Sequence, residues 1–84
     1  DIDISPNPAF INQASISFQL FEASRVKISM SNLLGLNIGS QNIELAPGEH
    51  NYKLSDLFLI PKEGAYVVMV ETFDSKSSKI IIIR

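Results

Sequence analysis

The stretch IPKEGAYVVMV, residues 60–70, joins a turn to a strand that stays apolar at nearly every position. Its Pro-Lys-Glu-Gly segment is typical of a sharp entry into a strand, because glycine adopts the positive φ of a tight turn without a steric cost. In β-sandwiches, a tyrosine near the start of such a strand bends its hydroxyl back to a backbone group, an arrangement called a tyrosine corner. Gly64 and Tyr66 fit this arrangement, with Pro61 stiffening the entry. The stretch therefore predicts a β-sandwich.

Alternation along this strand divides its side chains between the two faces of a sheet. Because successive strand residues point to opposite sides, we expect Tyr66, Val68 and Val70 to face the core. Val67 and Met69 then lie on the opposite face, which in a small antiparallel sheet is normally polar. The sequence thus predicts an apolar patch on the outside of this sheet.

Apolar and polar residues alternate in further segments on the N-terminal side of this stretch. The clearest candidate strands are residues 14–20 and 26–31. Shorter candidates lie at residues 36–38, 43–45 and 50–54, and a final aliphatic one at 79–83. These segments extend the strand pattern over most of the chain.

The segments between these strands read as turns, loops and connectors. We interpret residues 40–42 as a loop, residues 57–60 as an apolar connector and residues 74–78 as a hairpin loop. No segment shows the apolar spacing of a helix over a sufficient length. With about seven short strands, the sequence predicts an all-β fold, an immunoglobulin-like antiparallel β-sandwich, with a small barrel as the alternative.

The composition limits the classes of function. The chain has 84 residues, 45% of them hydrophobic, which suits one domain over residues 1–84. It has no cysteine, which excludes disulfides, thiolate catalysis and cysteine metal sites. The net charge of −2 and the scattered basic residues give no electrostatic footprint for nucleic acid. The longest strictly aliphatic run, residues 80–83, is far too short for a membrane span.

No group of residues suggests catalysis or a metal site. The single histidine is His50, and Ser55 and Asp56 lie together only in sequence, so we interpret all of them as surface residues. Asp1 and Asp3 lack the additional oxygen ligands that a calcium site needs. The sequence therefore indicates neither an enzyme nor a cofactor.

The last strand extends the outer apolar patch. If it pairs with the strand that contains Val67 and Met69, two of the four isoleucines in Ile80–Ile83 point outward in either register. Those two isoleucines can meet Val67 and Met69. The run is flanked by Lys79 and Arg84, as aggregation-prone strands often are. Such a patch is either an interaction surface or is covered by a neighbouring strand or by the rest of a larger protein.

Several motifs follow one another in order along almost the whole chain. A Pro-Asn-Pro opening occupies residues 6–8, a strand-turn-strand surrounds residues 32–35, and Pro61-x-x-Gly64-x-Tyr66-Val67-Val68 follows. Lys76 and Lys79, with two residues between them, precede an aliphatic tail that ends in a basic residue. This ordered set resembles the type A C-terminal sorting domain of proteins exported by the type IX (Por) secretion system of Bacteroidetes-type bacteria.

The resemblance implies an export signal rather than catalytic chemistry. It implies recognition in the periplasm by the outer-membrane translocon and its shuttle protein. It further implies removal by a sortase-like cysteine protease and attachment of the exported protein to anionic lipopolysaccharide at the cell surface. The residues that the resemblance assigns to recognition and sorting are Pro61, Gly64, Tyr66, Val67, Val68, Met69, Lys76, Lys79, Ile80, Ile81, Ile82 and Ile83.

Two alternatives remain open at the level of sequence. The domain could be retained uncleaved as a docking piece of the surface machinery, or it could be an immunoglobulin-like or fibronectin-like module that spaces a neighbouring enzyme domain. Because the sequence opens abruptly at Asp1, we expect it to be a piece of a longer exported protein. The free edge of the last strand also predicts a homodimer through that strand.

Overall fold

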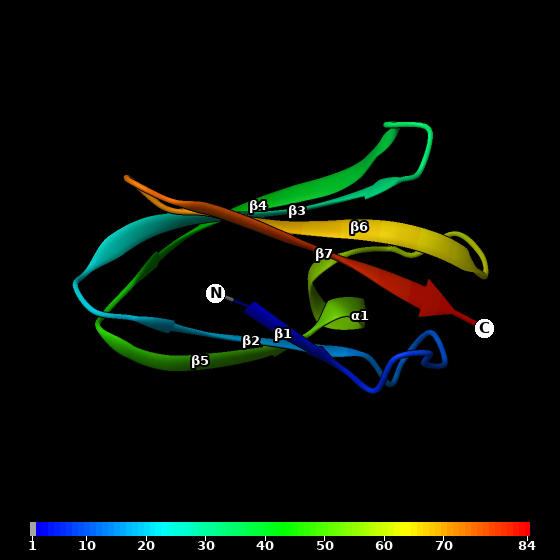
Figure 1. Cartoon of the computed structure of the whole chain (residues 1–84), viewed down its shortest axis with the longest axis horizontal. Helices are drawn as coiled ribbons and strands as arrows, with labels where there is room; N and C mark the ends of the chain where they lie inside the picture. Colours follow the sequence, from blue (N-terminus) through cyan, green and yellow to red (C-terminus); the bar gives the residue numbers. More distant parts are fainter. Residues whose placement is uncertain (1) are drawn as a thin grey trace.

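Two antiparallel sheets packed against each other form the protein, as the computed structural model of residues 2–84 shows (Figure 1). The smaller sheet has the strand order β1-β2-β5, with β1 at Ile2–Ser5, β2 at Ser15–Leu20 and β5 at Gly48–Lys53. The larger has the order β4-β3-β6-β7, with β4 at Asn37–Leu45, β3 at Ser24–Asn32, β6 at Gly64–Glu71 and β7 at Lys76–Ile83. The predicted sandwich of about seven strands is therefore confirmed.

The core lies between the two sheets and consists of the inward residues of the strands. Alternation buries every second side chain, so that β6 contributes Tyr66, Val68 and Val70. No polar or charged residue among residues 2–84 is buried. The fully buried large side chains are Ile16, Val26, Ile28, Met30, Leu54, Val68, Ile81 and Ile83. Tight apolar packing therefore holds the sheets together without a buried polar network.

Two polar segments that the sequence indicated as loops are strands. Residues 40–42 form the middle of β4, where Ser40 pairs with Ser29 across the ladder. Residues 76–78 belong to β7, and the turn before it is tighter than expected, because the Thr72 N–H donates to the Ser75 carbonyl at 2.8 Å. Both segments lie on edge strands, where polar side chains face water and backbone pairing alone defines the strand.

Two short elements were not predicted. β1 has only four residues, and its Ile2 and Ile4 pack into the core beside β2. The helix α1 spans Leu54–Leu57, a single turn closed by the Phe58 N–H donating to the Leu54 carbonyl at 2.9 Å. One turn is too short to display a helical period in the sequence. No helix within residues 2–84 is long and apolar enough to cross a bilayer.

The connection from α1 to β6 packs beneath β4. The Phe58 ring is buried against Gly39, where an added Cβ would lie 2.9 Å from the ring carbon Cδ1. Nearby, the Gln41 side-chain amide donates to the Leu57 carbonyl at 2.9 Å. Gly39 therefore leaves space for an aromatic ring that closes the core on this side.

Candidate functional site

The turn before β6 is a tyrosine corner. The Tyr66 hydroxyl donates to the Lys62 carbonyl at 2.6 Å, and the Tyr66 side chain is only 3% exposed. Gly64 has φ +150°, a backbone conformation that L side chains rarely adopt. The prediction made from Gly64 and Tyr66 is therefore confirmed, and Pro61 lies just before the turn as expected.

The tyrosine corner can be tested by removing one oxygen. Tyr66→Phe keeps the buried ring but loses the hydrogen bond to Lys62, so we expect the free energy of unfolding to fall by about 1–2 kcal/mol. Urea denaturation would measure this loss. The matched control is Tyr52→Phe, because the Tyr52 hydroxyl makes no hydrogen bond with the part of the chain described. Equal stability of the two variants would contradict a structural role for the Tyr66 hydroxyl.

The outer face of the larger sheet carries an apolar strip formed by β6 and β7. Val67 and Met69 are half-buried on this face, while Ile80 and Ile82 are 54% and 42% exposed. Ile80 pairs with Val67 across the ladder, whereas Met69 lies opposite Ser78. We call this set the outer strip; its members are Ala65, Val67, Met69, Ile80 and Ile82.

The outward direction of two isoleucines was predicted and is confirmed. Ile81 and Ile83 are 0% and 2% exposed and complete the core, so their neighbours Ile80 and Ile82 face outward. On the other side of β6, Met69 lies opposite Ser29 of β3. Val67 lies opposite Ser31 of the same strand, so small hydroxyl side chains border this part of the outer strip.

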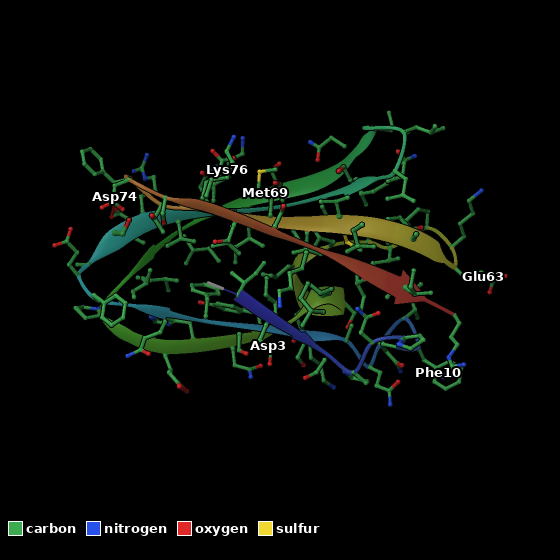
Figure 2. The ribbon with its side chains drawn as sticks, in the orientation of Figure 1. Asp3, Phe10, Glu63, Met69, Asp74 and Lys76 are labelled. Atoms are coloured by element: carbon green, nitrogen blue, oxygen red, sulfur yellow. The ribbon has the colours of Figure 1, made fainter. Side chains whose placement is uncertain are left out.

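The two lysines of the sequence motif lie on opposite sides of the sheet. Lys76 is paired with Glu71 on the outer face, the same side as Met69 (Figure 2). Lys79 is paired with the buried Val68, so its side chain lies on the opposite face of β7, where it reaches solvent at the sheet edge. Three positions apart on a strand, the lysines cannot form one basic patch.

The residue pattern of a known family extends over this whole arrangement. The profile described as "Secretion system C-terminal sorting domain" matches residues 3–84, which include all seven strands of the sandwich. The chain belongs to this family. No curated protein matches the sequence.

Membership of the family gives the sorting domain its general role. It is a C-terminal signal of the type IX secretion system, and it therefore interacts with the secretion machinery. Such a signal directs export across the outer membrane to the cell surface or the extracellular space. Sorting domains of this family are not catalytic.

The polar residues considered for chemistry are dispersed in the sorting domain. The His50 Nε2–H donates to the Ala46 carbonyl at 2.8 Å, and the imidazole ring lies 5.8 Å from the Phe18 ring. Ser55 and Asp56 lie on α1, which follows β5, and no hydrogen bond among residues 2–84 joins either side chain to His50. No three His, Asp or Glu side chains within residues 2–84 converge as metal ligands. Asp1, considered for calcium, lies outside the described residues.

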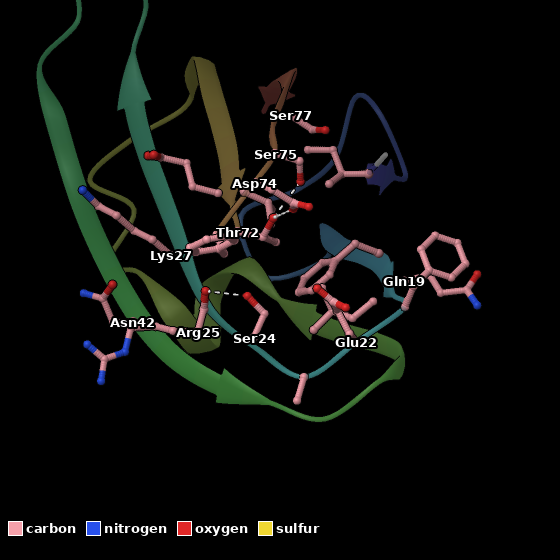
Figure 3. A pocket seen from close by; sticks show the side chains of 18 residues that line it. Gln19, Glu22, Ser24, Arg25, Lys27, Asn42, Thr72, Asp74, Ser75 and Ser77 are labelled. Atoms are coloured by element: carbon pink, nitrogen blue, oxygen red, sulfur yellow. Dashed lines mark hydrogen bonds between the residues drawn. The ribbon is translucent and has the colours of Figure 1, made fainter.

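The sorting domain also has a groove that the sequence did not predict. A groove of about 810 Å³ opens where the β2–β3 and β6–β7 turns meet (Figure 3). Phe21 and Phe73 line it, although their side chains are 88% and 94% exposed. Acidic and basic side chains both occur in its lining, among them Glu22 and Lys27. The two turns are far apart in sequence, and the pairing of β3 with β6, in which Lys27 lies opposite Glu71, brings them together.

One residue of the opening motif has a contact that the sequence could not reveal. The Asn7 side-chain amide bonds to β7, donating to the Ile80 carbonyl at 3.0 Å and accepting from the Ile82 N–H at 3.1 Å. The sequence marked residues 6–8 only as part of a signature. In the structure, they connect the opening of the sorting domain with its last strand.

Proposed function

We propose that the outer strip is the surface by which the outer-membrane translocon or its shuttle protein recognises the sorting domain. The observation that supports this proposal is a set of apolar side chains on the face turned away from the core, half-buried on β6 and exposed on β7. The inner face of the same strands already supplies the burial that folding needs, so stability does not require a second apolar face.

The chemistry of the outer strip suits a protein partner. Exposed apolar groups gain free energy when a partner removes them from water, and a few central side chains usually contribute most of the affinity. Val67 and Met69 are the central candidates, because the strand β6 that carries them lies between β3 and β7. Ile80 and Ile82 extend the surface to the sheet edge, with Lys76 on the same face.

The remaining residues of the recognition motif have supporting positions in this proposal. Pro61, Gly64 and Tyr66 fix the entry of β6, and Val68 anchors it in the core. On β7, the anchoring side chains are Ile81 and Ile83. Lys79 lies at the sheet edge and is available to an acidic partner group.

The later steps follow the pattern of the family. The sorting domain, over residues 1–84, forms the C-terminal part of a longer exported protein and is recognised in the periplasm. A sortase-like cysteine protease then removes it and joins the exported protein to lipopolysaccharide at the cell surface. Two copies of the domain could also pair through the edge of β7 at Lys76–Lys79. Along this stretch, the outer edge makes no backbone hydrogen bond to another segment of residues 2–84.

Separate substitutions on the two faces of β6 test the recognition surface. Val67→Lys and Met69→Lys should leave the melting temperature of the domain close to that of the parent, because both side chains are already partly hydrated. Surface yield of a fused reporter should nevertheless fall, since polar replacement at the centre of an interface weakens binding by about 1–2 kcal/mol each. The measurement pairs melting temperature with surface yield for each variant.

Two controls complete this test. Ser40→Lys places the same charge on the same face but on β4, away from the outer strip, and should change neither quantity. Val68→Lys should reduce export only together with stability, because Val68 is fully buried. Normal surface yield from stably folded Val67 and Met69 variants would show that the machinery reads another part of the domain.

A further inference from the structure

The connection between β1 and β2 is longer than its neighbours in the sheet require. Adjacent antiparallel strands can be joined by as few as about two residues. Here residues 6–14 leave the smaller sheet, reach the outer edge of β7 in the larger sheet and return to β2. The connection therefore runs from one sheet to the other before it returns.

Four hydrogen bonds attach this connection to β7 and to Arg84, the residue that follows it. In a parallel β-bridge, one residue donates to the carbonyl before its partner and accepts from the N–H after it. The Ala9 backbone does this around Ile83, donating to Ile82 O at 2.9 Å and accepting from the Arg84 N–H at 2.8 Å. The Asn7 side chain reproduces the same pattern around Ile81, with distances of 3.0 and 3.1 Å. A backbone bridge at Ile83 and a side-chain imitation of one at Ile81 thus lie next to each other along the edge of β7.

The residue types of the opening motif explain why a side chain takes this part. Pro6 and Pro8 have no backbone N–H, so neither can donate to the β7 edge. The primary amide of Asn7 supplies a donor and an acceptor on one planar group, as a peptide unit does. Ala9 is 1% exposed, and its small side chain allows the backbone to approach β7 closely.

The connection is braced by its own contacts. The Phe10 N–H donates to the Gln13 side-chain carbonyl at 3.0 Å, and the Gln13 N–H donates to the Phe10 carbonyl at 2.9 Å. The Arg84 guanidinium lies 5.8 Å from the centre of the Phe10 ring. The segment that carries Asn7 and Ala9 is therefore held in a defined shape at the end of β7.

We propose that residues 6–14 form a strap across the edge of β7 and that Asn7 is a positioning residue for recognition by the secretion machinery. The strap closes the edge from Ile80 to Arg84, so the machinery reads the face formed by the outer strip rather than adding a strand to the edge. This inference rests on the proposed role of the outer strip. It adds that the opening motif, residues 6–8, positions the aliphatic residues 80–83 of the last strand.

The strap has two physical effects on β7. An edge strand without partners on one side opens locally more often than a paired strand, and an open edge pairs with unrelated strands. The bonds of Asn7 and Ala9 oppose local opening and unrelated pairing at Ile80 and Ile82. The outer strip is then held in one arrangement before a partner arrives, which lowers the ordering cost of binding.

Substitution of Asn7 tests the strap. Asn7→Ala removes both bonds, and Asn7→Asp keeps the shape but loses the donor and places a carboxylate against the Ile80 carbonyl. In Asn7→Ala, in the 84-residue chain, we expect the Ile82 amide to exchange about tenfold faster, while the Ile81 amide, directed toward β6, changes little. Asn7→Asp keeps an acceptor for the Ile82 N–H, so Ile82 exchange should rise less in this variant. Surface yield of a fused reporter should fall several-fold. The matched control, Asn12→Ala, alters an exposed asparagine of the same connection and should behave as the parent.

Each other outcome overturns one part of the inference. Unchanged Ile82 exchange, or equal acceleration at all β7 amides, would show that Asn7 does not stabilise β7 locally at Ile82. Normal export by Asn7→Ala together with fast Ile82 exchange would show that recognition does not need the strap. That result would leave the role of the outer strip to be judged by the Val67 and Met69 variants, so failure of the strap and failure of the recognition surface are distinguishable.

Discussion

Deleting residues 76–84 is expected to unfold the sandwich and to abolish export of a fused reporter. The deletion removes Ile81 and Ile83, which are 0% and 2% exposed, and uncovers the flank of β6. Loss of one large buried aliphatic side chain typically costs about 2–5 kcal/mol, and a whole domain is stable by only about 5–15 kcal/mol. Circular dichroism on heating should therefore show no cooperative transition, and reporter protein should be missing from the surface fraction.

The control for this deletion keeps the strand and changes only its outer side chains. Ile80→Ser combined with Ile82→Ser leaves the buried isoleucines and the pairing with β6 in place, so the domain should still unfold cooperatively. Its export should fall because part of the outer strip is lost. A shortened chain that unfolds cooperatively and exports normally would contradict a role of β7 in both the core and the signal.

Gly39→Val is expected to destabilise the domain by about 2–3 kcal/mol, although no charge, hydrogen bond or turn is altered. The first added carbon would lie 2.9 Å from Phe58 Cδ1, closer than real carbon contacts allow, and a ring carbon next to the side-chain stem cannot move freely. Either Phe58 leaves its buried position or β4 moves away from the connection below it. Urea denaturation would measure the loss of stability.

A double variant and a neighbouring position identify the cause of this loss. Phe58→Leu removes the ring atoms that the valine would meet, so Gly39→Val should cost clearly less in that background. Ser40→Val introduces the same valine side chain at the neighbouring position, on the outer face of β4. There it should change the free energy of unfolding by less than about 0.5 kcal/mol. Equal costs of Gly39→Val with phenylalanine or leucine at position 58 would rule out the clash as the reason.

The parts of the fold that the sequence predicted are those with one buried and one free face. In β6, apolar residues alternate between the two faces of the sheet, so the burial of Tyr66 and Val68 and the partial exposure of Val67 follow from the pattern. The polar parts of the edge strands β4 and β7 lack this signal. Ser40 in β4 and Ser78 in β7 have polar neighbours because water is close, and only the backbone ladder shows that they are strand residues.

The candidate site was predictable only within single strands. The outward direction of Val67 and of two isoleucines follows from alternation, but the register that places Met69 opposite Ser78 follows from the length of the turn between β6 and β7. The contact of Asn7 with β7 joins positions 73 and 75 residues apart in sequence. No local pattern encodes a side-chain amide that imitates a peptide group.

The bonds between the strap and β7 have a consequence for the synthesis of the polypeptide. Every other strand of the domain precedes β7 in sequence, so a ribosome that stops early releases a polypeptide without Ile81 and Ile83 and without the groups to which Asn7 and Ala9 bond. Such a fragment contains the tyrosine corner and most of the core but cannot close the sandwich. We therefore expect that only a polypeptide translated through β7 acquires the folded export signal.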